Sequence, residues 1–273
     1  MTRLPPPPIE AAAPVDQVDL AATRAYYDDF ARRYDRPRGG RIPAGYHDLV
    51  DDLELDFLAR YATGKTVLEV GCGTGLLLGR MTRFATQARG IDLSEGMLER
   101  ARARGLEVVQ GSATALPFAD GSFDVACSFK VLAHVREVER ALAEMLRVVR
   151  PGGIVVAEFY NPRSLRALGK RFGPARAISD TTTEAAVYTR FDTPAQVHGY
   201  LPPGCAIAAS RGVRIVTPAA IALRVPLLGR ALRTLEHRLC DSPLSVFGGF
   251  WIAAIRKAAD AEEPRSRPST VDS

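Results

Sequence analysis

The chain has 273 residues, of which 47% are hydrophobic and 25% charged, and its formal net charge is +5. This composition suits an ordinary globular core, contains no apolar run near the ~20 residues of a membrane span, and lacks the blocks of like charge typical of nucleic-acid tails. The first residues show no secretory signal and the cysteines form no CxxC pair or metal cluster, so we expect a cytoplasmic protein with reduced thiols, no metal and no nucleic-acid partner.

The two ends of the chain have the composition of unstructured segments. PPPP at 5–8 favours extended polyproline geometry, and the C-terminal segment is polar and broken by prolines. We expect disorder over 1–14 and 259–273. Helical periodicity over 16–35 and 46–62 predicts two helices that cap the remaining domain, within segment 15–62.

Strands and helices then alternate. The predicted strands are 66–70, 88–92, 106–110, 123–129 and 152–160, and the predicted helices are 76–84, 94–105 and 136–149. Ser94 is placed as the cap of the second of these helices. This alternation predicts a doubly wound α/β fold, with a parallel sheet covered on both faces.

The C-terminal third adds three more elements. Thr193 and Pro194 predict the start of a short helix. Apolar segments predict a strand over 206–217 and a closing antiparallel strand over 247–257. Between these strands lies an amphipathic insertion, 217–246, which we expect to kink at Pro226.

The stretch VLEVGCGTG (67–75) carries the strongest functional signal, because a buried strand runs into Gly71, Gly73 and Gly75. A dinucleotide fingerprint would need glycine where Leu76 stands, and a P-loop would need Lys-Ser/Thr after the last glycine. With Glu69 before the turn and an aspartate ending the next strand, the pattern resembles motif I of the class I S-adenosylmethionine-dependent methyltransferases.

Later segments fall where that family's pattern places them. They are GSATALPF (111–118), DGSFDVACS (120–128) and LRVVRPGGIVV (146–156). The resemblance is to the group of ubiquinone- and menaquinone-biosynthesis and small-molecule methyltransferases, and it is densest over 64–160. It implies a Rossmann-like seven-stranded sheet, mostly parallel with an antiparallel last strand, in a methyltransferase domain over 15–258 whose cofactor-binding core is 63–160.

The resemblance also implies S-adenosylmethionine as the cofactor. Glycines at the turn leave room for its amino-acid part, Asp92 can accept both ribose hydroxyls, and Glu69 helps hold the loop and the ammonium. Position 112, often acidic in the family, is a serine here, which leaves the adenine amino group to the backbone of Ala113. The predicted cofactor contacts are Glu69, Gly71, Cys72, Gly73, Gly75, Asp92, Leu93, Ser112, Ala113 and Ser128.

Catalysis is less defined, because positioning alone supplies much of the rate of an in-line displacement. The catalytic candidates are His134, Lys130 and Tyr160, after the fourth and fifth strands. His134 is also interpretable as a packing residue and Lys130 as a solvated one. Tyr27 and Tyr34 on the first helix either close over the cofactor or pack as ordinary aromatics.

We expect a small methyl acceptor. Ser128-Phe129-Lys130 replaces the Asn/Asp-Pro-Pro motif of adenine methylases, and Cys127 lacks the neighbouring proline of cytosine methylases. Segments 161–205 and 217–246 are expected to select the acceptor. The insertion is interpretable as a cap over an apolar acceptor, as a surface helix touching a membrane or another subunit, or as packing on the sheet. A nicotinamide oxidoreductase and a cofactor-binding regulator without turnover stay open as alternatives, and the sequence predicts no oligomeric state.

Overall fold

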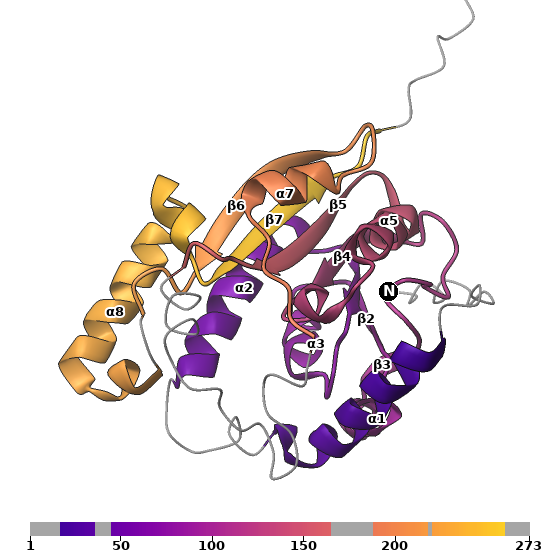
Figure 1. The fold of residues 1–273 in the computed structure, drawn as a ribbon, viewed down its shortest axis with the longest axis horizontal. Coiled ribbons are helices and arrows are strands. Elements are labelled where there is room, and N and C mark those ends of the chain that lie inside the picture. Colours follow the sequence, from indigo (N-terminus) through magenta and orange to yellow (C-terminus); the bar gives the residue numbers. More distant parts are fainter. Residues whose placement is uncertain (1–16, 36–44, 165–187, 218–219, 260–273) are drawn as a thin grey trace, which may run out of the picture.

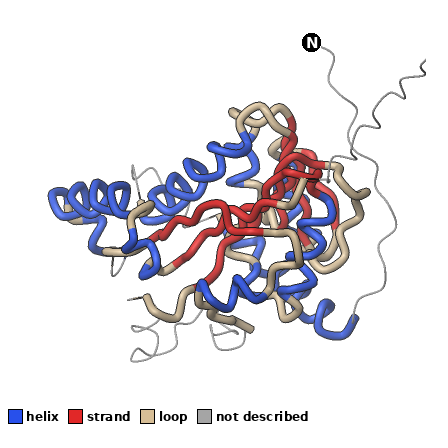
Figure 2. The backbone as a smooth tube through the Cα atoms, turned by 90° about the horizontal axis from the view of Figure 1, so that it is seen from above, coloured by secondary structure: helices blue, strands red, loops and turns tan. Residues whose placement is uncertain are grey.

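The computed structural model describes residues 17–35, 45–164, 188–217 and 220–259. Their centre is a seven-stranded sheet in the order β3-β2-β1-β4-β5-β7-β6, with helices on both faces (Figures 1 and 2). The termini predicted to be disordered lie outside the described residues, apart from Ala259.

The strands are β1 (Thr66–Val70), β2 (Gln87–Asp92), β3 (Glu107–Gln110), β4 (Phe123–Ser128), β5 (Val149–Tyr160), β6 (Ala206–Val213) and β7 (Phe250–Arg256). The α-helices are α1 (Gln17–Tyr34), α2 (Tyr46–Ala62), α3 (Leu76–Met81), α4 (Glu95–Ala103), α5 (Val138–Val148), α7 (Pro194–Gly199) and α8 (Pro226–Leu239). Short 3₁₀ helices are η1 (Leu132–His134), η3 (Ala220–Arg224) and η4 (Pro243–Phe247).

The sheet is parallel from β3 through β5, and β7 runs antiparallel between β5 and β6. This confirms the doubly wound fold and the antiparallel last strand. The chain winds outward from β1 to β3 on one side and from β4 onward on the other, so the carboxyl ends of β1, β2, β4 and β5 share one edge. Ligands of open α/β sheets bind at that edge.

Alternate residues of the strands face two hydrophobic cores. On β5, Val155, Ala157 and Phe159 pack with α5, while Val156 and Tyr160 pack on the opposite face, which α2 and α3 cover. Both faces are buried, which explains why the central strands read as continuous apolar runs.

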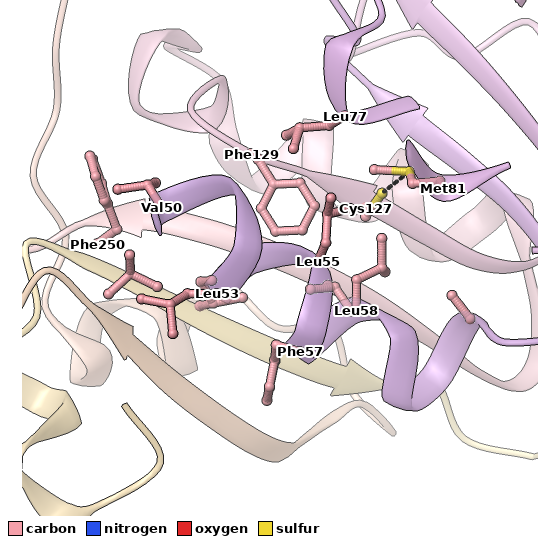
Figure 3. Close-up of a cluster of buried hydrophobic side chains, with 14 of the residues drawn as sticks. Val50, Leu53, Leu55, Phe57, Leu58, Leu77, Met81, Cys127, Phe129 and Phe250 are labelled. Carbon is pink, nitrogen blue, oxygen red and sulfur yellow. Dashed lines mark hydrogen bonds between the residues drawn. The ribbon is translucent and has the colours of Figure 1, made fainter. Parts of the chain in front are cut away.

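Helix α2 supplies much of the hydrophobic core on the face of the sheet that α2 and α3 cover (Figure 3). Leu53, Phe57 and Leu58 are completely buried, and in Figure 3 Leu55 lies beside Phe129 while Phe57 points to the other side of the helix. Burying each such side chain contributes about 1.5–3 kcal/mol, so α2 is an integral part of the domain.

Several predicted boundaries shift. The helix predicted over 76–84 ends at Met81, and the strand predicted to 217 ends at Val213, because Arg214 takes a left-handed conformation (φ 62°). Pro226 does not kink a helix: it starts α8 in the first turn, where its missing N–H costs nothing. The closing strand begins at Phe250, after η4. Within the described ranges, no helix combines the length and apolarity that crossing a bilayer requires.

Candidate functional site at the carboxyl edge of the sheet

The glycine turn after β1 is left-handed at all three glycines, with φ of 78° at Gly71, 53° at Gly73 and 80° at Gly75. A Cβ on Gly71 would lie 2.2 Å from Val131, and one on Gly75 would lie 2.3 Å from Leu106. At Gly73, by contrast, a Cβ would meet no atom of the described residues within 4 Å. The outer glycines therefore allow close packing, whereas the middle one borders open space, as the cradle of a ligand requires.

Asp92 links the turn to the end of β2. Its Oδ2 accepts a hydrogen bond from the Gly73 N–H at 2.8 Å, and its Oδ1 accepts one from the Ser94 N–H at 2.9 Å. Burial raises the pKa of Asp92 above its usual value, although these backbone donors oppose the shift. Each carboxylate oxygen keeps a second lone pair, so two further hydroxyl donors fit.

Glu69 lies on β1 below the turn and is 3% exposed. Its Oε2 has no hydrogen-bond partner among the described residues. Burial raises the pKa of this carboxyl well above its usual range, while the Lys130 ammonium lowers it. An unsatisfied buried carboxylate oxygen costs free energy, and a cationic ligand group would satisfy it.

The other predicted cofactor residues occupy the same edge. Ser112 Oγ lies 2.9 Å from Thr114 Oγ1, within the turn after β3. Ser128 Oγ donates to the Val70 carbonyl at 2.9 Å and so ties β4 to β1. Cys72 is buried, and burial raises the pKa of its thiol, so this thiol is a packing group. Leu93 and Ala113 are half-buried.

Helix α1 is fastened across this edge by two aspartates. Asp28 Oδ1 accepts from Ser94 Oγ at 2.6 Å and from the Gly96 N–H at 3.0 Å, at the start of α4. Asp35 accepts from Thr74 Oγ1 in the glycine turn at 2.8 Å. Burial, followed by the nearby Tyr26, Tyr160 and Asp92, raises the pKa of the Tyr27 hydroxyl. The Tyr27 hydroxyl therefore interacts electrostatically with Asp92, which ends β2, and with Tyr160, which ends β5.

Lys130, the second residue after β4, has a left-handed backbone (φ 62°), which is strained for a residue with a Cβ. Its Nζ donates to Asp51 Oδ1 at 2.9 Å and to Glu54 Oε2 at 2.8 Å, both on α2. Burial lowers the pKa of Lys130, but the carboxylates of Glu54, Asp51 and Glu158 outweigh it, and the pKa is raised. Lys130 is therefore a fixed cation between α2 and the sheet, and the solvated interpretation is wrong.

Two fully buried carboxyl groups accompany this lysine. Glu158 Oε1 accepts from the Lys130 N–H at 3.2 Å, while Glu158 Oε2 and Glu54 Oε1 have no hydrogen-bond partner among the described residues. Burial raises the pKa of both carboxyl groups, and that of Glu158 rises well above its usual range.

Aromatic rings surround Tyr160 at the end of β5. Its ring centroid lies 5.1 Å from that of Phe250, 6.1 Å from that of Phe191 and 5.7 Å from that of His134. His134 Nδ1 lies 2.8 Å from the Tyr188 carbonyl oxygen. Because a carbonyl only accepts, Nδ1 carries the hydrogen, and in the neutral ring Nε2 holds the lone pair.

Sequence reasoning missed the buried acids and the aromatic partners of Tyr160. Glu158 interrupts the apolar run IVVAEFY, and Asp51 and Glu54 stand three apart among the leucines of α2. A charge inside an apolar pattern is the available signal, since buried charges are nearly always paired. Within the described residues, no group of His, Cys, Asp or Glu side chains is arranged to hold a metal ion.

The sequence matches known proteins over the region of this site. Residues 68–157 match the family described as "Methyltransferase domain". A demethylmenaquinone methyltransferase of Mycolicibacterium paratuberculosis is 36% identical over 182 residues, covering 59% of this chain and 73% of that protein. One from Renibacterium salmoninarum is 37% identical over 157 residues, covering 56% of this chain and 62% of that protein. This chain therefore spans about three fifths of the length of several curated relatives, 62% and 57% in two cases.

Solved structures share the fold at lower identity. A methyltransferase of Thermotoga maritima matches with a TM-score of 0.60 at 22% identity, covering 85% of this chain and 99% of that one. The [4+2]-cyclase SpnF matches with a TM-score of 0.62 at 23% identity, covering 92% of this chain and 99% of that one. The sheet order and the glycine turn define the architecture of the class I methyltransferases. Within that class, the chain belongs to the S-adenosylmethionine-dependent methyltransferase family of the ubiquinone and menaquinone type.

Proposed function

We propose that this protein transfers the methyl group of S-adenosylmethionine to a small apolar acceptor. The observation that carries the proposal is the open space at Gly73, whose N–H is bonded by the Asp92 carboxylate, just after the strand on which Glu69 Oε2 lacks a hydrogen-bond partner among the described residues. These three features match an amino-acid backbone, a ribose diol and an ammonium group. The cofactor, when bound, supplies an electrophilic methyl group on a good leaving group.

The residues of the edge have distinct tasks in this proposal. Gly73 leaves room for the methionine part, Asp92 accepts the ribose hydroxyls, and Glu69 pairs with the ammonium. The backbone of Ala113 meets the adenine, and Leu93 packs against it. Tyr27, brought in by α1, helps to exclude water from the site. The remaining predicted contacts, Gly71, Cys72, Gly75, Ser112 and Ser128, shape the walls rather than bind through their side chains.

The acceptor enters on the side of Tyr160 in this proposal. Its ring, with those of Phe191, Phe250 and His134, forms an aromatic cluster, and aromatic rings pack well against flat apolar molecules. Curated relatives carry the names of demethylmenaquinone and ubiquinone-biosynthesis methyltransferases. A quinone-like aromatic ring is therefore the acceptor class we propose.

Proton removal from such an acceptor falls to His134 in this proposal. Its Nε2 holds the lone pair because Nδ1 is committed to the Tyr188 carbonyl. A neutral histidine accepts a proton from an acceptor hydroxyl as the methyl group transfers. The catalytic assignment of Lys130 stays a prediction, and its two ion pairs support a positioning role, in which it fixes the loop that leads to His134.

Calorimetry with S-adenosylmethionine and S-adenosylhomocysteine tests the cofactor assignment. We expect Asp92→Asn to weaken binding at least tenfold, since bonds to a charged group contribute about 1.5–3 kcal/mol. Asp124→Asn is the matched control: Asp124 also accepts a backbone N–H, from Thr66 at 2.8 Å, but stands at the opposite end of the strands. Equal affinities for the wild type and Asp92→Asn, or an equal loss in both variants, would refute the assignment.

A labelled-methyl transfer assay tests the acceptor. We expect transfer to a demethylated quinone supplied in its reduced, quinol form with an apolar tail, and less to a water-soluble quinol analogue. The fold alone does not define the reaction, since a structure of this fold carries the name of a cyclase. Cofactor binding without transfer to any quinone would therefore favour the regulatory alternative. The methyltransferase relatives do not favour the nicotinamide alternative.

A further inference from the structure

The outer side of η3 and α8 exposes large apolar side chains. Leu227 is 81% and Ile221 63% exposed, and Val225, Leu228 and Leu235 are exposed as well. Leu228 and Leu235 are seven residues apart and Leu227 and Leu235 eight, so the three lie along one stripe of the helix. We call these residues, together with Arg224, Arg230 and Arg238, the α8 surface.

The side of α8 opposite these leucines packs against the rest of the protein, so the leucines face outward. A Cβ on Gly229 would lie 2.4 Å from the Leu223 carbonyl oxygen, so the helix approaches η3 closely there. Glu236 is completely buried. It accepts from the N–H groups of Ile215, Val216 and Thr217 and from the Thr217 hydroxyl, at 2.8–3.0 Å. Figure 1 shows α8 at the outer left of the molecule, beyond α2.

The exposed charge beside these leucines is positive. Arg224, Arg230 and Arg238 are exposed, and none has an ion pair with another described residue. The two acids of segment 220–249 are occupied: Glu236 binds backbone N–H groups, and Asp241 pairs with Arg60 and Arg211 at 2.6–2.8 Å. Apolar side chains flanked by arginines complement the headgroups and acyl boundary of an anionic bilayer.

The apolar surface continues to the acceptor side. Leu244, Val246 and Phe247 of η4 are exposed. Asn161, directly after β5, donates through Nδ2 to the Val246 carbonyl at 2.6 Å and to the Gly248 carbonyl at 3.0 Å. The segment after α8 therefore touches the strand end that carries Tyr160.

We propose that the α8 surface docks this protein on an anionic phospholipid bilayer, with the leucines at the acyl boundary and the arginines on the phosphates. A second copy of the chain is the weaker occupant, because a self-complementary contact would bring arginines of both copies together. On the bilayer, the acceptor edge would lie beside the phase in which an apolar substrate dissolves.

Vesicle co-sedimentation of the full chain without cofactor tests the docking independently of methyl transfer. We expect binding to vesicles of phosphatidylcholine mixed with phosphatidylglycerol, weak binding to phosphatidylcholine alone, and loss of binding as salt screens the charges. Arg230→Glu and Arg238→Glu should each weaken binding about fivefold or more, since each basic residue near the surface contributes about 1 kcal/mol. Leu227→Ser should weaken it as well.

Arg83→Glu is the matched control, because Arg83 is exposed but lies before β2, outside the α8 surface. It changes the net charge as each arginine variant does and should leave binding within twofold. Far-UV circular dichroism and melting should show all variants folded, since the substituted side chains are exposed. Three results would overturn the proposal. Arg83→Glu could lose as much vesicle binding as the α8 variants, or the wild type could bind neutral vesicles as strongly as anionic ones. The third result is a dimer that Leu227→Ser dissociates while vesicle binding is unchanged.

Discussion

Replacing Lys130 by methionine tests whether the buried acids depend on one cation. Methionine keeps the apolar stem but removes the ammonium that bonds Asp51 at 2.9 Å and Glu54 at 2.8 Å. Each such bond contributes about 1.5–3 kcal/mol, and breaking a buried pair from one side costs about 3–5 kcal/mol. The side chains of Lys130, Asp51 and Glu54 are 19%, 10% and 0% exposed, so little solvent screening reduces this. We expect unfolding in urea to require about 3–5 kcal/mol less at neutral pH.

The same variant has a characteristic pH dependence. Burial raises the pKa of Glu54 and Glu158, and the Lys130 ammonium opposes this shift. Without Lys130 the pKa values of these two glutamates lie further above their unfolded values, so the variant loses stability as pH rises through them. The loss of unfolding free energy in Lys130→Met relative to the wild type should therefore shrink in acid, below the unfolded pKa of about 4.3 for glutamate. Glu158→Gln is the matched control: its amide oxygen can still accept from the Lys130 N–H and both ion pairs of Lys130 remain, so its stability should stay near that of the wild type. A deficit below about 1 kcal/mol, or one independent of pH, would refute the reasoning.

Three further outcomes follow from the site and its supports. Gly73→Val should weaken S-adenosylmethionine binding at least tenfold in calorimetry, because its side chain enters the open space above the turn; unchanged affinity would place the cofactor elsewhere. Cofactor affinity should also fall in acid at a pH above the ordinary aspartate range, since burial raises the pKa of Asp92; an affinity constant across this range would contradict its role. Glu236→Ala should destabilise the fold by about 3 kcal/mol in urea, because four donors lose their acceptor; full stability would mean that α8 is held otherwise.

The glycine turn and its contact with Asp92 could be predicted because their requirements are local. A left-handed turn needs glycine at specific positions, and all three glycines show φ above 50°. Asp92 ends the neighbouring strand, so its meeting with Gly73 follows from the parallel order alone. The short helix after Thr193 was equally readable, because its cap bond to the Gln196 N–H joins residues three apart.

The buried acids could not be predicted, because their partners are distant in sequence. Lys130 meets Glu54 across 76 positions and the backbone of Glu158 across 28. Sequence patterns show that an acid interrupts an apolar run, but tertiary packing decides which cation comes to it. The insertion 217–246 could likewise be predicted only in part. Its amphipathic pattern was clear, but in the structure the buried side of α8 carries Glu236 and the exposed side carries Leu227. In most surface helices the apolar side is the buried one.

Replacing Glu69 by glutamine tests whether this residue binds the cofactor or only supports the fold, because the two roles predict opposite effects on stability and on cofactor affinity. Its Oε2 is buried and unpaired among the described residues, and burial raises its pKa well above the usual value. A raised pKa means that stability is full below the unfolded pKa and is lost as pH rises toward the folded one. Glu69→Gln removes this loss, so the variant without cofactor should be more stable than the wild type at alkaline pH and equal to it near pH 4, about the unfolded value. If Glu69 has the proposed role, the same change removes the charge that would pair with the cofactor's ammonium, so binding should weaken about tenfold or more. A variant that is less stable and binds as tightly as the wild type would assign Glu69 to the fold alone.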